Sequence, residues 1–494
     1  MKNKKFITLA LSFAFFLGNI RAVAHEEELF FPVEIKNGSN LSVIECVALA
    51  FKNSPKIRQK KYELDIASSN LGIARSQYFP TFNAGAGFYH ENNSNKKYYD
   101  RYYRELPNAG VSLNQLVWNF GKTTAYVKME EFYKIAAEYE FMDSLCSTLF
   151  DIKEKYYELL RAEAMLQISE NNVEINEHYV QISKPGPDLT TAKVNLSKSK
   201  IEHIETLNKF KNAKVDLSNA MYIEKMPDFS IKGTETFNFD NAYDYNKPKK
   251  LVPKFKKQAF AFTRDKAIDI AYNSSPDLKA LEATKKAMEQ SLLFIKRTYF
   301  PDLTANVGYG LNNSNTQSTN NSLQVGVNLS TSVNLMELKH SIKGADAQVN
   351  LAENEITLFK KDLYYELERA FNNVDKAAAS IEIAQQNAQE SLDNIKAVEN
   401  EYLTDKADYN ALQDARIDYI DSVGQYVNSL FDYNMALIQV EHAMHYHLVD
   451  IHHRSEHAMA FHSDDLIKHL NEVLGCDEKE TGRKLKFRKV KDSL

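Results

Sequence analysis

Two kinds of hydrophobic periodicity follow one another along the chain, and the same succession occurs twice. Apolar residues at helical spacing fill residues 41–54, "LSVIECVALAFKNS", and residues 263–275, "TRDKAIDIAYNSS". After Pro80 and Pro301 the pattern alternates instead, and "LTANVGYGL" and "LQVGVNLSTSV" carry apolar residues on one face and small or polar residues on the other. The strands "TFNAGAGFY" and "VSLNQLVWNF" follow Pro80 in the same way. The pattern predicts helices and then a β-hairpin in each half.

An internal repeat relates the two halves. Pro55 and Pro80 are 25 residues apart, as are Pro276 and Pro301. Each of these segments opens on Ser-Pro and closes on Tyr-Phe-Pro, and an offset of 221 residues relates them. Self-similarity at a fixed offset indicates duplication of a structural unit, and two copies are too few for a solenoid.

A long helical segment follows each predicted hairpin. Residues 122–184 contain neither glycine nor proline, and residues 337–402 contain only Gly344 as a helix breaker. Continuous helices over these segments measure about 95 to 100 Å. The turn signals "SKPGPD" and "LTDKAD" end them, and a further helical segment follows each turn. The sequence therefore predicts two antiparallel helical hairpins that are longer than a compact domain.

The predicted strands have the length of membrane-spanning β-strands. Each is about 10 residues long, as a tilted transmembrane strand requires. The polar segments "ENNSNKKYYDRYYRELPN" and "NNSNTQSTNNS" are expected to be the loops of the two hairpins. Four strands cannot close a barrel, and open sheet edges are not stable in lipid, so several chains are expected to contribute. Three copies would supply twelve strands.

The N-terminus has the features of a signal peptide. Lys2, Lys4 and Lys5 precede the apolar run "FITLALSFAFFLG", and small residues follow at Ala22 and Ala24. This arrangement predicts export and cleavage after Ala24, because the apolar run is shorter than the roughly 20 residues that a spanning helix needs. A single uncleaved anchor is the alternative.

The domain boundaries follow from these patterns. Residues 1–24 are the predicted signal peptide, 25–225 the first structural repeat, 226–262 a linker or equatorial segment, 263–450 the second repeat, and 451–494 a His-containing periplasmic tail.

Composition and motifs argue against several functional classes. The formal net charge of −5 shows no basic surplus, which disfavours nucleic-acid binding. Three scattered cysteines are too few for a disulfide framework or a zinc site. The sequence has no metalloprotease helix motif, phosphate-binding loop or nucleophile elbow, so neither an enzyme nor a cofactor is expected.

Histidines gather near the C-terminus. His453 and His457 would lie on one face of a helix, and with His452 they form a candidate site for zinc, copper or nickel. A His-rich tract points to metal by composition only, so a solvated tail packed on the exterior of the helices is the alternative.

The ordered, duplicated units resemble the TolC family of outer-membrane efflux channels over residues 41–444. The resemblance is carried by the two helix–Pro–helix–"YFP" units, the hairpins, "VSLNQLVWNFG", "DLTTAKVNL" and "DYNALQDAR". It implies a mostly α-helical fold with a small β part. Three chains would form a twelve-stranded barrel in the outer membrane and a twelve-helix periplasmic tunnel. The implied partners are a periplasmic adaptor (membrane-fusion) protein, an inner-membrane transporter and outer-membrane lipid.

The resemblance also suggests residues at the periplasmic gate. Tyr402 matches a family tyrosine and Asp414 a family acid, whereas Ala407 stands where a basic partner is expected. Lys406, next in the sequence, is a candidate substitute for that partner. Asp408 is a further candidate for the pore gate, where a ring of carboxylates would concentrate cations.

The turns of the two helical hairpins are the expected adaptor-docking tips. They contain Gly186, Asp188, Asp405 and Ala407. For Asp188 and Asp408 the alternative role is to cap the return helices, where an acid binds free N–H groups.

Two departures from the family concern the hairpins and the corners that follow them. Leu116 replaces the family's proline in the second strand, and Glu337 stands in the second half where the first has Gly121.

Two functions are consistent with the sequence. One is a passive duct that carries solutes across the periplasm and outer membrane together with a pump. The other is a non-conducting structural or adhesive protein of the cell envelope.

Overall fold

The computed structural model describes residues 35, 37–94, 101–223, 227–233, 263–314 and 317–445, and the side chains of residues 88–108 and 311–321 lie outside this description. The predicted signal peptide, the tail of residues 451–494 and most of the linker also lie outside it.

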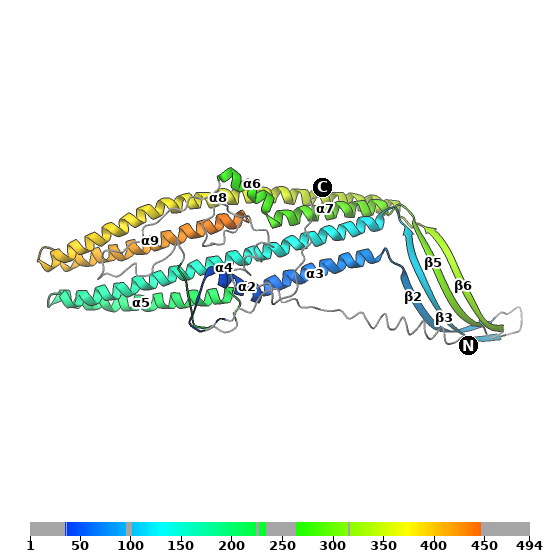
Figure 1. The fold of residues 1–494 in the computed structure, drawn as a ribbon, viewed down its shortest axis with the longest axis horizontal. Helices are drawn as coiled ribbons and strands as arrows, with labels where there is room; N and C mark the ends of the chain where they lie inside the picture. The colour runs from blue at the N-terminus through cyan, green and yellow to red at the C-terminus, as the bar shows by residue number, and fades with distance from the viewer. Residues whose placement is uncertain are drawn as a thin grey trace, which may run out of the picture.

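Apart from two short strands of the first half, both halves contain the same elements in the same order (Figure 1). The first half consists of β1 (Ser39–Leu41), α2 (Val43–Asn53), α3 (Pro55–Ser76), β2 (Thr81–Ser94), β3 (Arg101–Trp118), α4 (Lys122–Ile182), α5 (Pro187–Ala220) and β4 (Phe229–Ile231). The second half consists of α6 (Arg264–Ser274), α7 (Pro276–Arg297), β5 (Asp302–Ser314), β6 (Gln317–Ser330), α8 (Leu335–Leu403) and α9 (Tyr409–Ala443). The predicted duplication is confirmed.

The repeated Ser-Pro pair separates two helices in each half. The Ser54 hydroxyl accepts a hydrogen bond from the Ile57 N–H at 3.3 Å and caps α3, and the Ser275 hydroxyl accepts from the Leu278 N–H at 3.2 Å and caps α7. The proline that follows each serine lies at the start of the helix, where its missing N–H costs no intrahelical hydrogen bond. The pair is therefore a helix boundary and not a kink.

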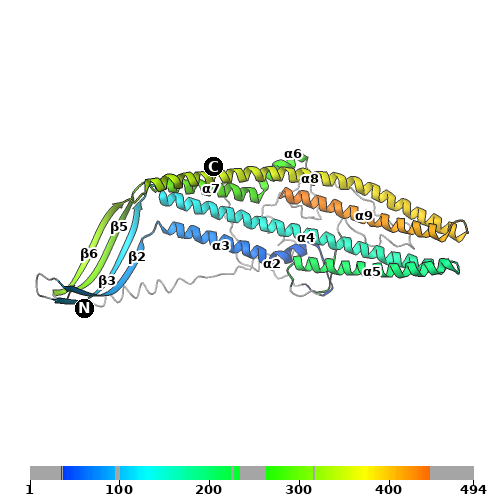
Figure 2. The same cartoon turned by 180° about the vertical axis from the view of Figure 1, so that it is seen from behind.

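The long helices are continuous. Helix α4 has 61 residues and α8 has 69, and Gly344 does not interrupt α8. Their lengths are about 90 and 100 Å at 1.5 Å per residue. Figures 1 and 2 show an elongated molecule with the sheet at one end and the α4–α5 and α8–α9 turns together at the other.

The four long strands form one antiparallel sheet in the order β2-β3-β5-β6. The strands reach 13 to 18 residues and run through most of the segments that the sequence predicted to be loops. That prediction was wrong because it relied on polar composition. Backbone pairing holds regardless of side-chain polarity, as the pairing of His90 with Glu105 and of Asn312 with Asn320 shows.

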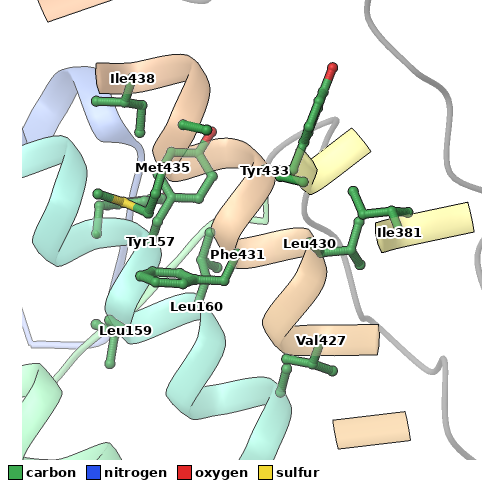
Figure 3. Packing of buried hydrophobic residues seen from close by; sticks show 14 of the residues in the cluster. Tyr157, Leu159, Leu160, Ile381, Val427, Leu430, Phe431, Tyr433, Met435 and Ile438 are labelled. Carbon is green, nitrogen blue, oxygen red and sulfur yellow. The ribbon is translucent and has the colours of Figure 1, made fainter. Parts of the chain in front are cut away.

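The apolar core follows the seam between α4, α8 and α9 (Figure 3). Leu160 of α4 and Phe431 and Leu430 of α9 are at most 9 % exposed. The aromatic ring of Phe431 also contacts the Arg161 guanidinium, which lies 4.1 Å from the ring centroid. Apolar packing along this seam joins the two helical hairpins.

A short parallel strand pair marks the middle of the molecule. Strands β1 and β4 pair there, and β4 lies within the predicted linker. The buried Tyr156 hydroxyl of α4 is 3.0 Å from the Leu41 carbonyl and 2.6 Å from the Lys232 carbonyl, and these contacts fix the strand pair against the long helix.

Two neighbouring acids are partly buried where α3, α4 and α7 pack together. Burial, with Asp277 nearby, raises the pKa of Asp143 to about 6, and burial also raises the pKa of Asp277. Lys60 opposes the shift, and its ammonium lies 2.9 Å from the Glu140 carboxylate. The Asp143 carboxylate is therefore held ionised at neutral pH in an unfavourable environment.

The Asp143→Asn variant is expected to be more stable than the wild type at pH 7.5. The folded-state pKa lies above the unfolded value, so the folded protein binds the extra proton and Asp143 reduces stability as the pH rises from about 4 to 6. The gain is expected to be at most about 3 kcal/mol above pH 6 and to vanish near pH 4. Chemical unfolding of the two proteins, followed by circular dichroism in detergent across this range, measures it. A pH-independent difference would contradict the assignment.

Candidate functional site

The sheet has one apolar and one polar face. Cross-strand neighbours on the first face form the rows Phe82–Leu113–Val307–Val325 and Ala84–Val111–Tyr309–Leu323. On the other face the rows are Thr81–Asn114–Asn306–Gly326 and Asn83–Ser112–Gly308–Gln324. These four rows contain no charged residue. A sheet of this kind suits a wall between lipid and a water-filled interior.

The corners between sheet and long helices are built differently in the two halves. In the first, Phe120 and Gly121 have φ values of 55° and 80°, and the Arg297 guanidinium donates to the Gly121 carbonyl at 2.8 Å. The positive φ is what favours glycine at position 121, because the Cβ that would lie 2.6 Å from Arg297 Nη1 meets only the mobile end of a flexible side chain. In the second half, the Asn334 side chain caps α8 by accepting from the Glu337 N–H at 3.3 Å. Asn334 is therefore the counterpart of Gly121 at the helix start, and Glu337, which the sequence aligned with that glycine, lies in the first turn of α8.

Exposed aromatic residues gather at this junction. They are Tyr78, Phe79, Phe82, Trp118, Phe120, Tyr299 and Phe300, each at least 38 % exposed. The rings of Phe120 and Phe300 stack with centroids 4.9 Å apart and link the two halves. The tyrosine and tryptophan rings among them are amphipathic and favour the boundary between a membrane and water, so this end of the strands suits such a boundary.

Among the described residues, no element covers either lateral edge of the molecule. Strands β2 and β6 are the edges of the sheet. The helices next to the sheet lie side by side in the order α3-α4-α7-α8, so α3 and α8 are the outer helices. Exposed apolar residues lie along α3 and α8, and along α5 as well. They are Tyr62, Ile66 and Ile73 on α3, Val194, Ile201, Ile204 and Val215 on α5, and Leu351, Leu358 and Tyr365 on α8. The α8 residues recur every seven positions, which is the spacing of a coiled-coil seam.

The two helical turns lie at the end farthest from the strands (Figure 2). Gly186 is the exposed N-cap of α5 with φ of 124°, and a Cβ added to it would have no atom within 4 Å. In the other turn Asp405 has φ of 61°, and its side chain is 75 % exposed. Ala407 is half-buried beside it. The expected docking tips therefore present accessible backbone and side chains.

Tyr402 connects the two tips. It is 1 % exposed, and its hydroxyl donates to Asp188 Oδ2 at 3.2 Å while accepting from the Lys184 N–H at 3.2 Å. Its ring packs edge-on against Tyr409, with centroids 5.9 Å apart. The tyrosine thus joins the end of α8 to the turn between α4 and α5.

The basic residue beside Tyr402 is Lys184 and not Lys406. The Lys184 ammonium pairs with the Asp405 carboxylate and lies 5.4 Å from the centre of the Tyr402 ring. The sequence suggested Lys406 because it neighbours Ala407, but the partner comes from the other hairpin. The signal that could have found Lys184 is its position next to the first turn.

The two acids at the helix starts differ. Asp408 is the N-cap of α9, and its carboxylate accepts from the Ala411 N–H at 2.9 Å. For Asp188 the alternative role was the same, but Gly186 is the N-cap of α5, and Asp188 lies in the first turn, where it meets the positive end of the helix dipole and binds the Tyr402 hydroxyl. Capping therefore accounts for Asp408 alone.

Asp414 is exposed on α9, two turns from the tip. Its neighbours one turn on, Ile417 and Asp418, are exposed as well, whereas Gln413 and Ala415 on either side of it are buried. Asp414 therefore lies on the exposed side of α9 and not in the packed seam.

The candidate metal ligands His452, His453 and His457 lie outside the described residues. Within those residues, no three His, Cys, Asp or Glu side chains are grouped so that they could hold a metal ion. No helix in the described part of the chain combines the length and hydrophobicity that crossing a membrane requires.

Comparisons with known proteins agree with this architecture. The family model for "Outer membrane efflux protein" matches residues 47–221 and 267–444. The solved CmeC outer membrane channel of Campylobacter jejuni is 15 % identical, with a TM-score of 0.68 over 84 % of this chain and 91 % of that one. VceC of Vibrio cholerae is 14 % identical, with a TM-score of 0.67 over 81 % and 95 %. The open state of Neisseria gonorrhoeae MtrE is 12 % identical, with a TM-score of 0.66 over 84 % and 94 %. No curated protein sequence matches the chain.

The chain belongs to the outer membrane efflux protein family. It is an outer-membrane efflux channel with a long periplasmic extension, and the non-conducting structural or adhesive role is not supported. The expected fold class, with long helical hairpins and a small sheet, is confirmed.

Proposed function

We propose that three copies of this chain close into one channel, which conducts solutes together with a periplasmic adaptor and an inner-membrane transporter. The open edges support this arrangement. Each copy would place β6 and α8 against β2, α3 and α5 of the next, in a head-to-tail contact that closes into a ring. Three copies supply twelve strands, which close a barrel with its apolar face toward lipid.

The single observation that carries the proposal is the alignment of these edges. The sheet edges and the apolar stripes on α3, α5 and α8 lie along the same two sides of the elongated molecule. A monomer would leave both the strand edges and the apolar stripes exposed. A second copy offers the complementary edge along the whole length.

Purification in mild detergent followed by planar-bilayer recording tests the proposal. The expected result is a particle with the mass of three chains that conducts ions. A monomeric particle would contradict the proposal. A trimer that conducts no ions would contradict it as well.

The partner proteins are proposed from the position of the tips. The turns around Gly186 and Ala407 lie farthest from the strands, so they are the part of the chain nearest to an inner-membrane partner. Each copy has two such turns, so three copies would present six turns in a ring. We infer that an adaptor binds across these turns.

We also propose that the tips form the closed gate and that Asp414 faces the passage. In a ring of three, Asp414 would be repeated as three carboxylates, which attract cations and repel anions. Tyr402, bound to Asp188, would hold the neighbouring tips together in the closed form. Asp408 is left out of the gate because it caps α9.

The Asp414→Asn variant is expected to lose cation preference and to be blocked less strongly by multivalent cations. Trimer stability is expected to change little, because the side chain is exposed and projects from the seam. Single-channel recordings in asymmetric salt measure both properties. Asp408→Asn is the matched control, and it is expected to change neither selectivity nor the α9 cap appreciably, because asparagine caps a helix about as well as aspartate. Unchanged selectivity and block in Asp414→Asn would exclude the role.

A further inference from the structure

A second set of polar contacts joins the two hairpins deeper than the tips. We call it the Arg416 layer, and it consists of Asn172 of α4, Asn195 and Glu202 of α5, and Tyr409, Gln413 and Arg416 of α9. Arg416 Nη1 donates to Asn172 Oδ1 at 2.5 Å, and Arg416 Nε donates to Gln413 Oε1 at 3.1 Å. The layer lies about two turns into α9.

The contacts of the layer cross three helices. Asn172 Nδ2 donates to Glu202 Oε2 at 3.2 Å, so one amide links Arg416 to α5. Gln413 Oε1 also accepts from Asn195 Nδ2 at 3.0 Å, and Gln413 Nε2 donates to the Tyr409 hydroxyl at 2.6 Å. Both Asn172 and Gln413 are buried, at 3 % and 7 % exposed. Each amide therefore uses both its oxygen and its nitrogen within the protein.

The charged Arg416 guanidinium needs its hydrogen-bond acceptors at fixed positions. Burial lowers the pKa of Arg416, but the guanidinium stays charged because its ordinary pKa is so high. The oxygens that receive its hydrogen bonds belong to the amides of Asn172 and Gln413. If α9 slid along α4, these bonds would break and leave a partly buried charge without its acceptors, which is costly.

The apolar seam above the layer lacks this directional requirement. Leu160, Phe431 and Met435 pack there through non-directional contacts (Figure 3). Hydrogen bonds weaken steeply when distance or angle changes, whereas apolar side chains can exchange neighbours at lower cost. The layer, more than the apolar seam, therefore determines how far α9 is shifted along α4.

We propose that the Arg416 layer is a positioning device that holds the α8–α9 hairpin against the α4–α5 hairpin in the closed channel. Opening the narrow end would require α9 to move relative to α4, and Arg416 would then leave Asn172. This inference rests on the proposed gate at the tips and adds a second point of resistance behind it. Arg416 acts on the passage through the position of α9 and not by touching the solute.

Planar-bilayer recordings of the Arg416→Met variant test the inference. Methionine keeps the volume and helix propensity but removes both hydrogen bonds, so the ratio of open to closed channels is expected to rise about tenfold. Arg161→Met is the matched control, because Arg161 bridges the same two helices by its contact with Phe431 far from the tip. It is expected to leave the open fraction unchanged.

Two further variants show whether a negative result comes from failed assembly, from the tip gate or from the layer itself. If Arg416→Met does not assemble, Arg416→Lys keeps the charge but cannot reproduce the paired geometry, and a rise in its open fraction would support the inference. Tyr402→Phe, which removes the Tyr402–Asp188 contact, reports on the tip gate itself. If Tyr402→Phe opens the channel while both Arg416 variants conduct like the wild type, the layer has no positioning role. If none of the proteins conducts, the proposed channel function fails first and the inference fails with it.

Discussion

The Leu358→Glu variant is expected to abolish trimer formation. Leu358 is 60 % exposed in the single chain and lies in the middle of the apolar stripe Leu351–Leu358–Tyr365 on α8. In the proposed ring this stripe packs against the next copy, and a glutamate there would bury a charge without a partner. Each of the three interfaces would then lose about 3 to 5 kcal/mol. Light scattering of the detergent-solubilised protein is expected to show one chain per particle.

A polar position on the same helix provides the control. Thr357 is exposed next to Leu358 but lies outside the stripe, so Thr357→Glu adds the same charge to α8 without entering the contact. This variant is expected to remain trimeric, and both variants are expected to keep the helical circular dichroism of the wild type. A trimeric Leu358→Glu particle would show that α8 is not an interface.

The combined Gly186→Trp and Ala407→Trp variant is expected to abolish export while the trimer remains intact. Two indole rings per copy would cover both turns at the end where we propose that the adaptor binds. The change lies far from the sheet and from the apolar stripe on α8, so assembly should not be affected. Export in cells carrying the variant is expected to fall to the level of cells without the channel, with normal amounts of trimer in the outer membrane.

The backbone at Gly186 requires its own control. Its φ of 124° is disfavoured for any residue with a Cβ, so part of the effect of tryptophan there could come from a distorted turn. Gly186→Ala introduces the same strain without bulk, because no atom lies within 4 Å of the added Cβ. Normal export by Gly186→Ala together with loss of export in the double variant identifies bulk as the cause. Normal export by the double variant would refute docking at the tips.

Local patterns in the sequence were sufficient to predict where the helices lie. The absence of breakers between residues 122 and 184 predicted α4 almost to its ends, and the Ser-Pro pairs marked the starts of α3 and α7. These features act over three or four residues through hydrogen bonds and capping, so they can be read from the chain directly.

The strands were predicted in place but not in length. Alternation identifies the paired segments, whereas polar composition predicts loops for the stretches beyond them. Strand length depends on the partner strand, because each residue is held by a hydrogen bond to a residue elsewhere in the chain. Asn108, for example, pairs with Gly87 on one side and with Asn312 on the other.

The sequence by itself determined the two-fold repeat, the long hairpins and the alternating strands, and its resemblance to the family suggested Tyr402 and Asp414 as gate candidates. Only the tertiary structure decided their partners. Lys184 lies 218 residues from Tyr402, and Asn172 lies 244 residues from Arg416, so nothing in the local sequence links the members of either pair. The reason is physical: helices about 100 Å long have many equivalent polar positions along each face, and the packing of one hairpin on the other selects which of them meet.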